Sequence, residues 1–359
     1  MNQERWIATN GLGVGVLALA MAGAAHAQSS VTLYGAVDTG LLFTNKSLNA
    51  STGRNGTEFS LVDSADSVSM FGLSGEEDVG NGVKAKFKLE SGFSMTNGAF
   101  NDSNGNFFGR QAWIGLSNGL GEFKTGLQFS PFLLSLYELD ARGLSQFGSS
   151  IVNYVDNVLA TGIFNANAVS YSSPVFAGLQ GSVMFAFGGE AGNFSAGRQY
   201  SASLKYDNGS VMVSSSLYNG NAGGTAQTPV PTTEPFLGRM LGGAYKFGKV
   251  TVKASFASYK VAGSFNNNVY GGGVDYLVLP DLDVNGGVWV TSDRNQTKNH
   301  SLMGATGARY FLSKRTTVYG QVGVVNNHGA MNTGLSIDGA LNGVTGTTVG
   351  ANVGINHHF

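Results

Sequence analysis

The chain has 359 residues, of which 12% are charged, with a formal net charge of -1 at pH 7 and no cysteine. The near-zero net charge gives no reason to expect a nucleic-acid partner, and the lack of cysteine excludes disulfides, thiolate metal sites and a cysteine nucleophile. Glycine supplies 54 residues, about twice its usual share, and aromatic residues are abundant. This combination is typical of many strands joined by turns.

The N-terminal residues have the pattern of an export signal. Arg5 precedes an apolar run over residues 12–25, which ends near the Ala-His-Ala tripeptide of residues 25–27. We therefore expect a signal peptide over residues 1–27 and a mature protein over residues 28–359. A membrane anchor is the alternative, although the run is short for the ~20 residues that a spanning helix needs. The mature chain contains no second long apolar run, which excludes helical membrane spanning there.

Two-residue alternation is clearest between Val83 and Phe93. Apolar residues there alternate with charged ones, among them Lys84, Lys86 and Lys88. Successive side chains of a strand point to opposite faces, so this segment predicts a strand with one apolar and one charged face. Similar patterns predict about sixteen strands. They lie near residues 30–44, 66–77, 82–95, 107–117, 121–130, 166–173, 178–188, 198–207, 210–219, 236–247, 249–261, 268–279, 282–292, 299–312, 316–326 and 346–359.

The connections between these strands alternate between short and long. Tight turns such as Asn118-Gly119-Leu120 are followed by long polar stretches. The long ones include residues 45–63, 96–106, 219–235 and 327–345. This asymmetry is typical of an up-and-down transmembrane barrel with periplasmic turns and extracellular loops. All six prolines fall between the strands, as ladder hydrogen bonding requires, and no linker divides the chain. We expect one all-β domain without a convincing helix.

Energetics favours a membrane barrel over a soluble β-sandwich, which is the alternative. Several strands carry an apolar file long enough to face lipid, whereas Lys84, Lys86 and Lys88 in that file would cost up to ~2–4 kcal/mol each. We therefore predict a closed ring that is apolar outside and wet inside, with these lysines on the bore. Examples of the apolar files are Val31, Leu33, Val37, Leu41 and Phe43; Leu179, Val183, Phe185 and Phe187; and Val349, Ala351, Val353, Ile355 and Phe359.

Several segments carry a recognisable family pattern. They include Ser30-Val31-Thr32-Leu33-Tyr34-Gly35, Gly75-Glu76-Glu77-Asp78-Val79-Gly80-Asn81-Gly82-Val83-Lys84-Ala85, Arg110-Gln111-Ala112-Trp113-Ile114-Gly115-Leu116, Leu312-Ser313-Lys314-Arg315-Thr316 and the terminal Gly354-Ile355-Asn356-His357-His358-Phe359. With these residues the mature chain resembles the general porins of Gram-negative bacteria, of the kind common in Burkholderia, Bordetella and Neisseria relatives.

The resemblance implies a sixteen-stranded antiparallel β-barrel in the outer membrane, surrounded by lipid and assembled as a homotrimer. It implies passive diffusion of ions and small hydrophilic solutes, without a cofactor. The terminal Phe359 resembles the signal that the barrel-assembly machinery recognises. The third long loop, from about Ser130 to Asn165, is implied to fold inward and narrow the pore; an ordinary surface loop is the alternative.

Opposing charges at a constriction set the ion preference of such a pore. At several positions where the general porins that this chain resembles carry such charges, this chain has neutral residues, namely Met70, Ser74, Leu127, Gln146 and Ser170. Our hypothesis is a cationic wall that faces carboxylates on the third loop, with a solvated surface role as the alternative for each lysine and a position near the outer strand end as the alternative for Arg110. The predicted wall is Lys84, Lys86, Lys88, Lys124 and Arg110, the facing acids are Glu138, Asp140 and Asp156, and Arg142 and Asp38 are also predicted to line the pore.

Signals for enzymatic chemistry are weak. The adjacent His357 and His358 point to opposite faces of a strand, and the mature chain has no HExxH, GxSxG or phosphate-binding motif. We predict a channel that is not an enzyme and holds no metal. The alternatives are a substrate-selective outer-membrane channel, a barrel enzyme with a site near its rim, and a secreted adhesin, whose solubility would not depend on detergent.

Overall fold

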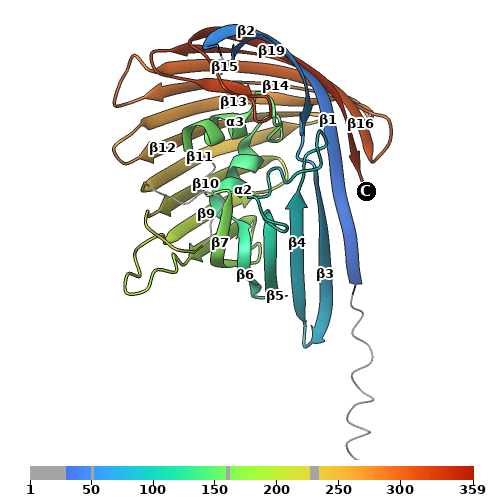
Figure 1. Ribbon diagram of the computed structural model, residues 1–359. Helices are drawn as coiled ribbons and strands as arrows, with labels where there is room; N and C mark the ends of the chain where they lie inside the picture. Colours follow the sequence, from blue (N-terminus) through green and yellow to red (C-terminus); the bar gives the residue numbers. More distant parts are fainter. Residues whose placement is uncertain (1–29, 50–51, 159–161, 227–233) are drawn as a thin grey trace, which may run out of the picture.

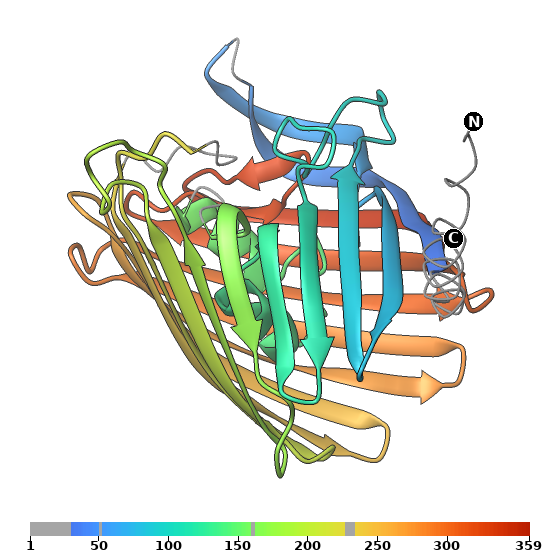
Figure 2. The ribbon, with the colours of Figure 1, turned by 90° about the horizontal axis from the view of Figure 1, so that it is seen from below.

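Among the residues that the structure describes, seventeen antiparallel strands form one sheet, which closes where β1 (Ser30–Asn49) pairs with β19 (Gly346–His358). β2 (Arg54–Asp63) and β3 (Met70–Gly80) pair with successive parts of β1 and share one place in the ring, so the barrel has sixteen strand positions. The predicted antiparallel barrel is therefore confirmed (Figures 1 and 2). The other strands of the ring are β4 (Val83–Gly92), β5 (Gln111–Asn118), β6 (Gly121–Phe129), β7 (Phe164–Ser172), β8 (Leu179–Ala186), β9 (Gln199–Asp207), β10 (Val211–Gly220), β11 (Phe236–Phe247), β12 (Val250–Val261), β13 (Asn266–Leu279), β14 (Leu282–Asp293), β15 (His300–Phe311) and β16 (Thr316–His328).

The structure is a computed structural model that describes residues 30–49, 52–158, 162–226 and 234–359. The predicted signal peptide over residues 1–27 lies outside these ranges. Within them, neither helix is long and apolar enough to cross a membrane.

The alternation of side chains gives the barrel an apolar outer surface and a polar inner one. On β19, Val353 and Ile355 are 58% and 45% exposed on the outside, whereas Asn352 and Asn356 are buried inside at 2% and 4%. Tyrosines and phenylalanines at strand ends, such as Tyr245 and Phe247, are also exposed. Apolar side chains exposed in a continuous band fit hydrocarbon rather than water, and aromatic residues fit its interfaces.

β2 is the main departure from the predicted strand boundaries. The sequence predicts a long loop over residues 45–63, which is wrong, because β1 and β2 run through most of it. Only Phe59 and Leu61 give β2 an exposed apolar file, and the polar residues before them hide the alternation. β2 forms because it pairs with β1, in a register that places Leu41 opposite Leu61, and local composition does not indicate this pairing.

Residues 64–69 separate β2 from β3 and turn into the barrel, so the strand predicted over 66–77 begins later than expected. Asp38, predicted to line the pore, binds this turn instead. Its carboxylate accepts the backbone N–H of Ala65 at 3.0 Å and of Ser67 at 2.9 Å. Asp38 is fully buried, with 0% of its surface exposed, and therefore does not contact the bore.

Two short helices, which the sequence analysis does not predict, lie inside the barrel in the segment between β6 and β7 (Figure 1). They are α2 (Pro131–Leu139) and α3 (Ser150–Val158). Ser130 caps α2 by accepting the Leu133 N–H, and proline occupies the first helical position, a start signal that was available in the sequence. Buried aromatic rings join the helices to the inner side of β10–β12. These rings are Phe132, Tyr154, Tyr218, Phe236 and Tyr259.

Candidate functional site

Carboxylates on the inner side of β3–β6 each pair with two cations. Glu76 pairs with Lys84 and, at 4.0 Å, with Lys86. Glu122 pairs with Lys86 at 3.2 Å and with Lys124 at 3.7 Å. These side chains alternate with outward apolar ones, so the strand period alone brings them to one inner surface.

Glu90 completes the arrangement. Its carboxylate pairs with Lys88 at 3.1 Å and with Arg110 at 2.9 Å, and accepts the hydroxyl of Tyr34 at 2.8 Å. The five predicted cations thus share three carboxylates, which leaves two positive charges uncompensated in these pairs. We call this group the cationic wall: Lys84, Lys86, Lys88, Arg110, Lys124, Glu76, Glu90 and Glu122.

Glycine on β5 leaves the space that the cationic wall needs. Gly115 lies opposite Lys86 on one side and Lys124 on the other. A Cβ at Gly115 would come within 2.9 Å of the Lys124 Cγ and 2.5 Å of the Phe123 carbonyl oxygen. The Lys124 ammonium also lies 5.0 Å from the centre of the Trp113 ring, a cation–π distance. Two neighbours on β5 therefore fix the position of Lys124: Gly115 leaves space for its side chain, and the Trp113 ring contacts its ammonium group.

The acids of the third loop bind partners away from the cationic wall. Glu138 pairs with Lys205 of β9 at 2.5 Å, and the Asp156 carboxylate accepts the Gly334 N–H at 2.7 Å. Asp140 is 1% exposed and accepts backbone N–H groups of its own loop, including that of Ser150 at 2.8 Å. The structure brings the predicted cations together but does not pair them with these three acids.

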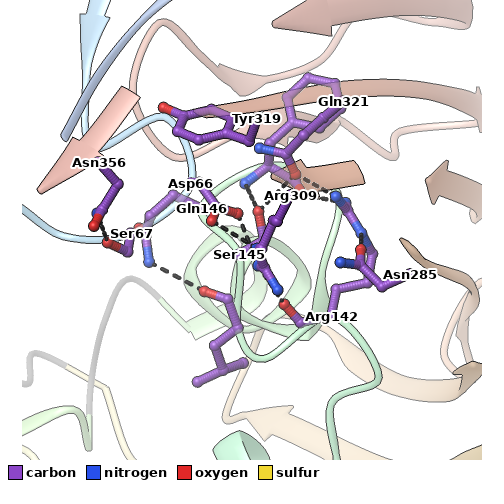
Figure 3. A network of polar contacts seen from close by, with 12 residues as sticks. Asp66, Ser67, Arg142, Ser145, Gln146, Asn285, Arg309, Tyr319, Gln321 and Asn356 are labelled. Carbon is purple, nitrogen blue, oxygen red and sulfur yellow. Dashed lines mark hydrogen bonds and ion pairs between the residues drawn. The ribbon is translucent and has the colours of Figure 1, made fainter. Parts of the chain in front are cut away.

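Arg142 is fully buried and attaches the loop to the far side of the barrel (Figure 3). Its Nε donates to Asn285 Oδ1 of β14 at 2.9 Å, and its guanidinium also binds Gln321 of β16. Burial lowers the pKa of Arg142 to about 10, and Asp66 is the leading opposing influence. At neutral pH the side chain is still charged, and its contacts are with the fold rather than with an open bore.

The loop between β16 and β19 also folds inward and joins the third loop. It contains a small hairpin of β17 (Thr333–Ser336) and β18 (Ala340–Asn342). Gly148 N–H donates to the Leu335 carbonyl at 2.7 Å, and Ile337 N–H donates to the Gln146 carbonyl at 2.9 Å. The two loops therefore form one hydrogen-bonded partition inside the barrel, here called the inner partition: residues 131–158 and 333–342.

An ion pair between Asp66 and Arg309, which the sequence analysis does not predict, lies beside the inner partition. The Asp66 carboxylate and the Arg309 guanidinium make two contacts of 2.9 Å each. Asp66 belongs to the inward turn over residues 64–69, and its carbonyl accepts the Gln146 N–H of the inner partition. Arg309 lies two residues from Gly307 on β15 and therefore on the same, inward face, so its direction was readable from the sequence, whereas its partner was not.

Comparisons with known proteins agree with this geometry. The sequence profile described as Gram-negative porin matches residues 13–330. The chain is 30% identical to an outer membrane porin protein of Bordetella pertussis, over 94% of this chain and 96% of that protein. It is also 30% identical to outer membrane porin protein 32 of Delftia acidovorans, over 96% of this chain and 99% of that one.

Solved structures show the same architecture. The anion-selective porin from Comamonas acidovorans has a TM-score of 0.79 and 28% identity, over 92% of this chain and 100% of that chain. An in-vitro folded outer membrane protein of Vibrio cholerae, with a TM-score of 0.66 and 14% identity, covers 92% of this chain and 98% of its own and shares the fold alone.

Proposed function

The chain belongs to the Gram-negative porin family, and we propose that its channel prefers anions to cations. As a member of this family it is an outer-membrane channel for the passive diffusion of ions and small hydrophilic solutes. The family and the fold point to a channel rather than an enzyme. The observation that carries the proposed preference is the cationic wall, where five cations share three carboxylates.

Partial exposure allows this wall to act on ions in the bore. The lysine side chains of the wall are 21% to 49% exposed, so they contact water while lying in a barrel with low-dielectric surroundings. Charges in such a confined aqueous path raise the local concentration of counter-ions, within a Debye length of ≈ 8 Å at physiological salt. The acids of the third loop have partners away from this wall: Glu138 pairs with Lys205, Asp140 accepts the Ser150 N–H and Asp156 accepts the Gly334 N–H.

A charge reversal in planar lipid bilayers tests the proposal. Replacing Lys84, Lys86 and Lys88 with glutamate should move the reversal potential measured in a KCl gradient toward cation preference. The matched control places the same three-fold charge reversal on exposed turns, as Lys249→Glu, Lys314→Glu and Arg315→Glu. An unchanged reversal potential in the wall variant, or an equal change in the control, would contradict the assignment.

We propose in addition that the protein is a homotrimer and that the barrel-assembly machinery recognises Phe359. The family resemblance supports the first. For the second, the exposed terminal ring lies at the seam, where Gly35 and Phe359 exchange two backbone hydrogen bonds of 3.0 Å. Chemical cross-linking of the detergent-solubilised protein tests the trimer: a species of three chains is expected, and monomers alone would contradict it.

A further inference from the structure

An apolar cavity of about 420 Å³ lies between the inner partition and the barrel wall. The partition contributes Leu134, Tyr137 and Leu144, and the wall contributes Met70 and Phe129. Pockets that hold small molecules have this character, with mostly apolar walls and few polar groups. A path for purely hydrophilic solutes has no need of such a lining.

Helix α2 presents apolar side chains on two faces, and only one of them is covered. Phe132, Leu136 and Leu139 are at most 2% exposed. Leu134 and Tyr137, three residues apart and therefore on one face, are 47% and 57% exposed. They line the cavity inside the barrel, so lipid does not reach them. Large apolar side chains that stay exposed on a helix within an aqueous bore indicate contact with something that passes through it.

One cation borders the same cavity. Arg110 lies over the Phe129 ring, 5.6 Å from its centre, and pairs with Glu90 at 2.9 Å. Glu90 in turn binds Lys88, so a series of cations leads along the wall to the edge of the apolar surface. Asp102 also borders the cavity, and burial raises the pKa of its carboxyl.

We propose that this cavity is a binding site for monocarboxylates with an apolar body, such as aryl-alkanoates. The apolar body contacts Leu134 and Tyr137, while the carboxylate lies toward Arg110 and the lysines of the cationic wall. The site makes the channel selective among anions, favouring amphipathic ones over small hydrophilic ones. This inference rests on the proposed anion preference and adds the class of solute.

Block of the chloride current by 3-phenylpropionate, measured in planar bilayers, tests the inference. Acetate and 3-phenylpropylammonium are the matched probes, because one lacks the ring and the other reverses the charge. In the unmodified channel, half-block is expected at a concentration at least about tenfold lower for 3-phenylpropionate than for either probe. In the variant Leu134→Ser with Tyr137→Ser, block by 3-phenylpropionate should weaken about tenfold while block by acetate stays the same.

The control variant Leu120→Ser removes an exposed leucine from the β5–β6 turn, outside the cavity, and should leave every block unchanged. Equal block by the ammonium probe, or undiminished block in the Leu134 and Tyr137 variant, would overturn the inference. Reversal potentials in KCl are measured on the same channels. If the unmodified channel prefers chloride but is not blocked by 3-phenylpropionate, only the binding site is contradicted. If the unmodified channel does not prefer chloride, the proposed function is contradicted.

Discussion

Asp66 and Arg309 form a two-point ion pair, with Oδ2 to Nε and Oδ1 to Nη2 each at 2.9 Å. Arg309 Nη2 also donates to the carbonyl of Arg142 at 3.1 Å, so one guanidinium connects the inward turn, the inner partition and β15 (Figure 3). Burial alone would raise the pKa of Asp66, but Arg309 outweighs it and holds that pKa below its usual value. The pair is therefore ionised at neutral pH and fixes the partition to the wall.

Replacing Asp66 with asparagine should release the inner partition. The variant leaves the largely buried Arg309 charge paired with Asp283 at the longer distance of 4.0 Å, so the loss is below the roughly 3–5 kcal/mol that a fully buried, unpartnered charge costs. Amide hydrogen exchange of residues 142–148 should accelerate, since their contacts depend on this attachment. Glu76→Gln, which breaks the exposed pairs with Lys84 and Lys86 outside the partition, is the control and should leave that exchange unchanged. Equal exchange in all three proteins would contradict the anchoring role.

A pH-dependent contact is expected where the loop of residues 96–106 meets the β17–β18 hairpin. Burial and the nearby Asp102 and Asp63 raise the pKa of Asp338 to about 7, and Asn101 Nδ2 donates to its carboxyl at 3.1 Å. A carboxyl whose pKa is raised by folding is protonated more readily in the folded state. The contact is therefore most favourable below the unfolded pKa of about 4 and weakens as the pH rises through 7.

A spin label attached at Ala99→Cys reports this change, because the chain has no cysteine of its own. Label mobility should increase between pH 5.5 and pH 8.5, and Asp338→Asn should remove the dependence. A pH response that persists in the asparagine variant would place the titrating group elsewhere.

Gly115→Ala should disturb the cationic wall without reaching the inner partition. The added Cβ would crowd Lys124 and the Phe123 carbonyl, at a cost of about 1–3 kcal/mol for overpacking. Urea unfolding should show this loss, and the reversal potential should move away from anions as Lys124 shifts. Gly119→Ala, in the adjoining turn with open space around it, is the matched control and should do neither. Identical behaviour of the two variants would contradict the spatial argument.

Much of this architecture was predictable from side-chain period alone. Alternation places Lys84, Lys86 and Lys88 on one face of β4, because neighbouring side chains of a strand must diverge, and in the structure all three pair with carboxylates of the cationic wall. The same alternation places Asp38 inside the barrel, but alternation does not indicate that a turn covers it. That turn depends on contacts such as Asp38 with Ser67, which lie far apart along the chain.

The inner partition was the least predictable part. Arg142 and Asp140 are charged residues in a loop, so composition suggests solvent and a role in the bore. Their burial depends on partners such as Asn285, 143 residues away from Arg142, and on backbone groups that only the folded loop brings together. Helix α2 was marked by Ser130 and Pro131, but with nine residues it is too short for a clear apolar period.

The terminal ring provides a test of barrel closure that is separate from assembly in the cell. Phe359 packs against Gly35, where a Cβ would lie only 2.4 Å from its Cζ. Phe359→Ala should lower the free energy of unfolding in detergent by about 1–2 kcal/mol, less than for a core phenylalanine because the ring is partly exposed. Reversible unfolding in urea, without any cellular factor, measures this change in the free energy of unfolding. An unchanged stability would restrict Phe359 to recognition during assembly.

The reversal potential of the unmodified channel under a tenfold KCl gradient tests the central claim most directly. In its ion pairs the cationic wall has five cations and three carboxylates. This excess predicts a reversal potential of the sign that chloride selectivity gives, and the potential should decrease at high salt as the charges are screened. A potential of the sign set by potassium at low salt would contradict the account.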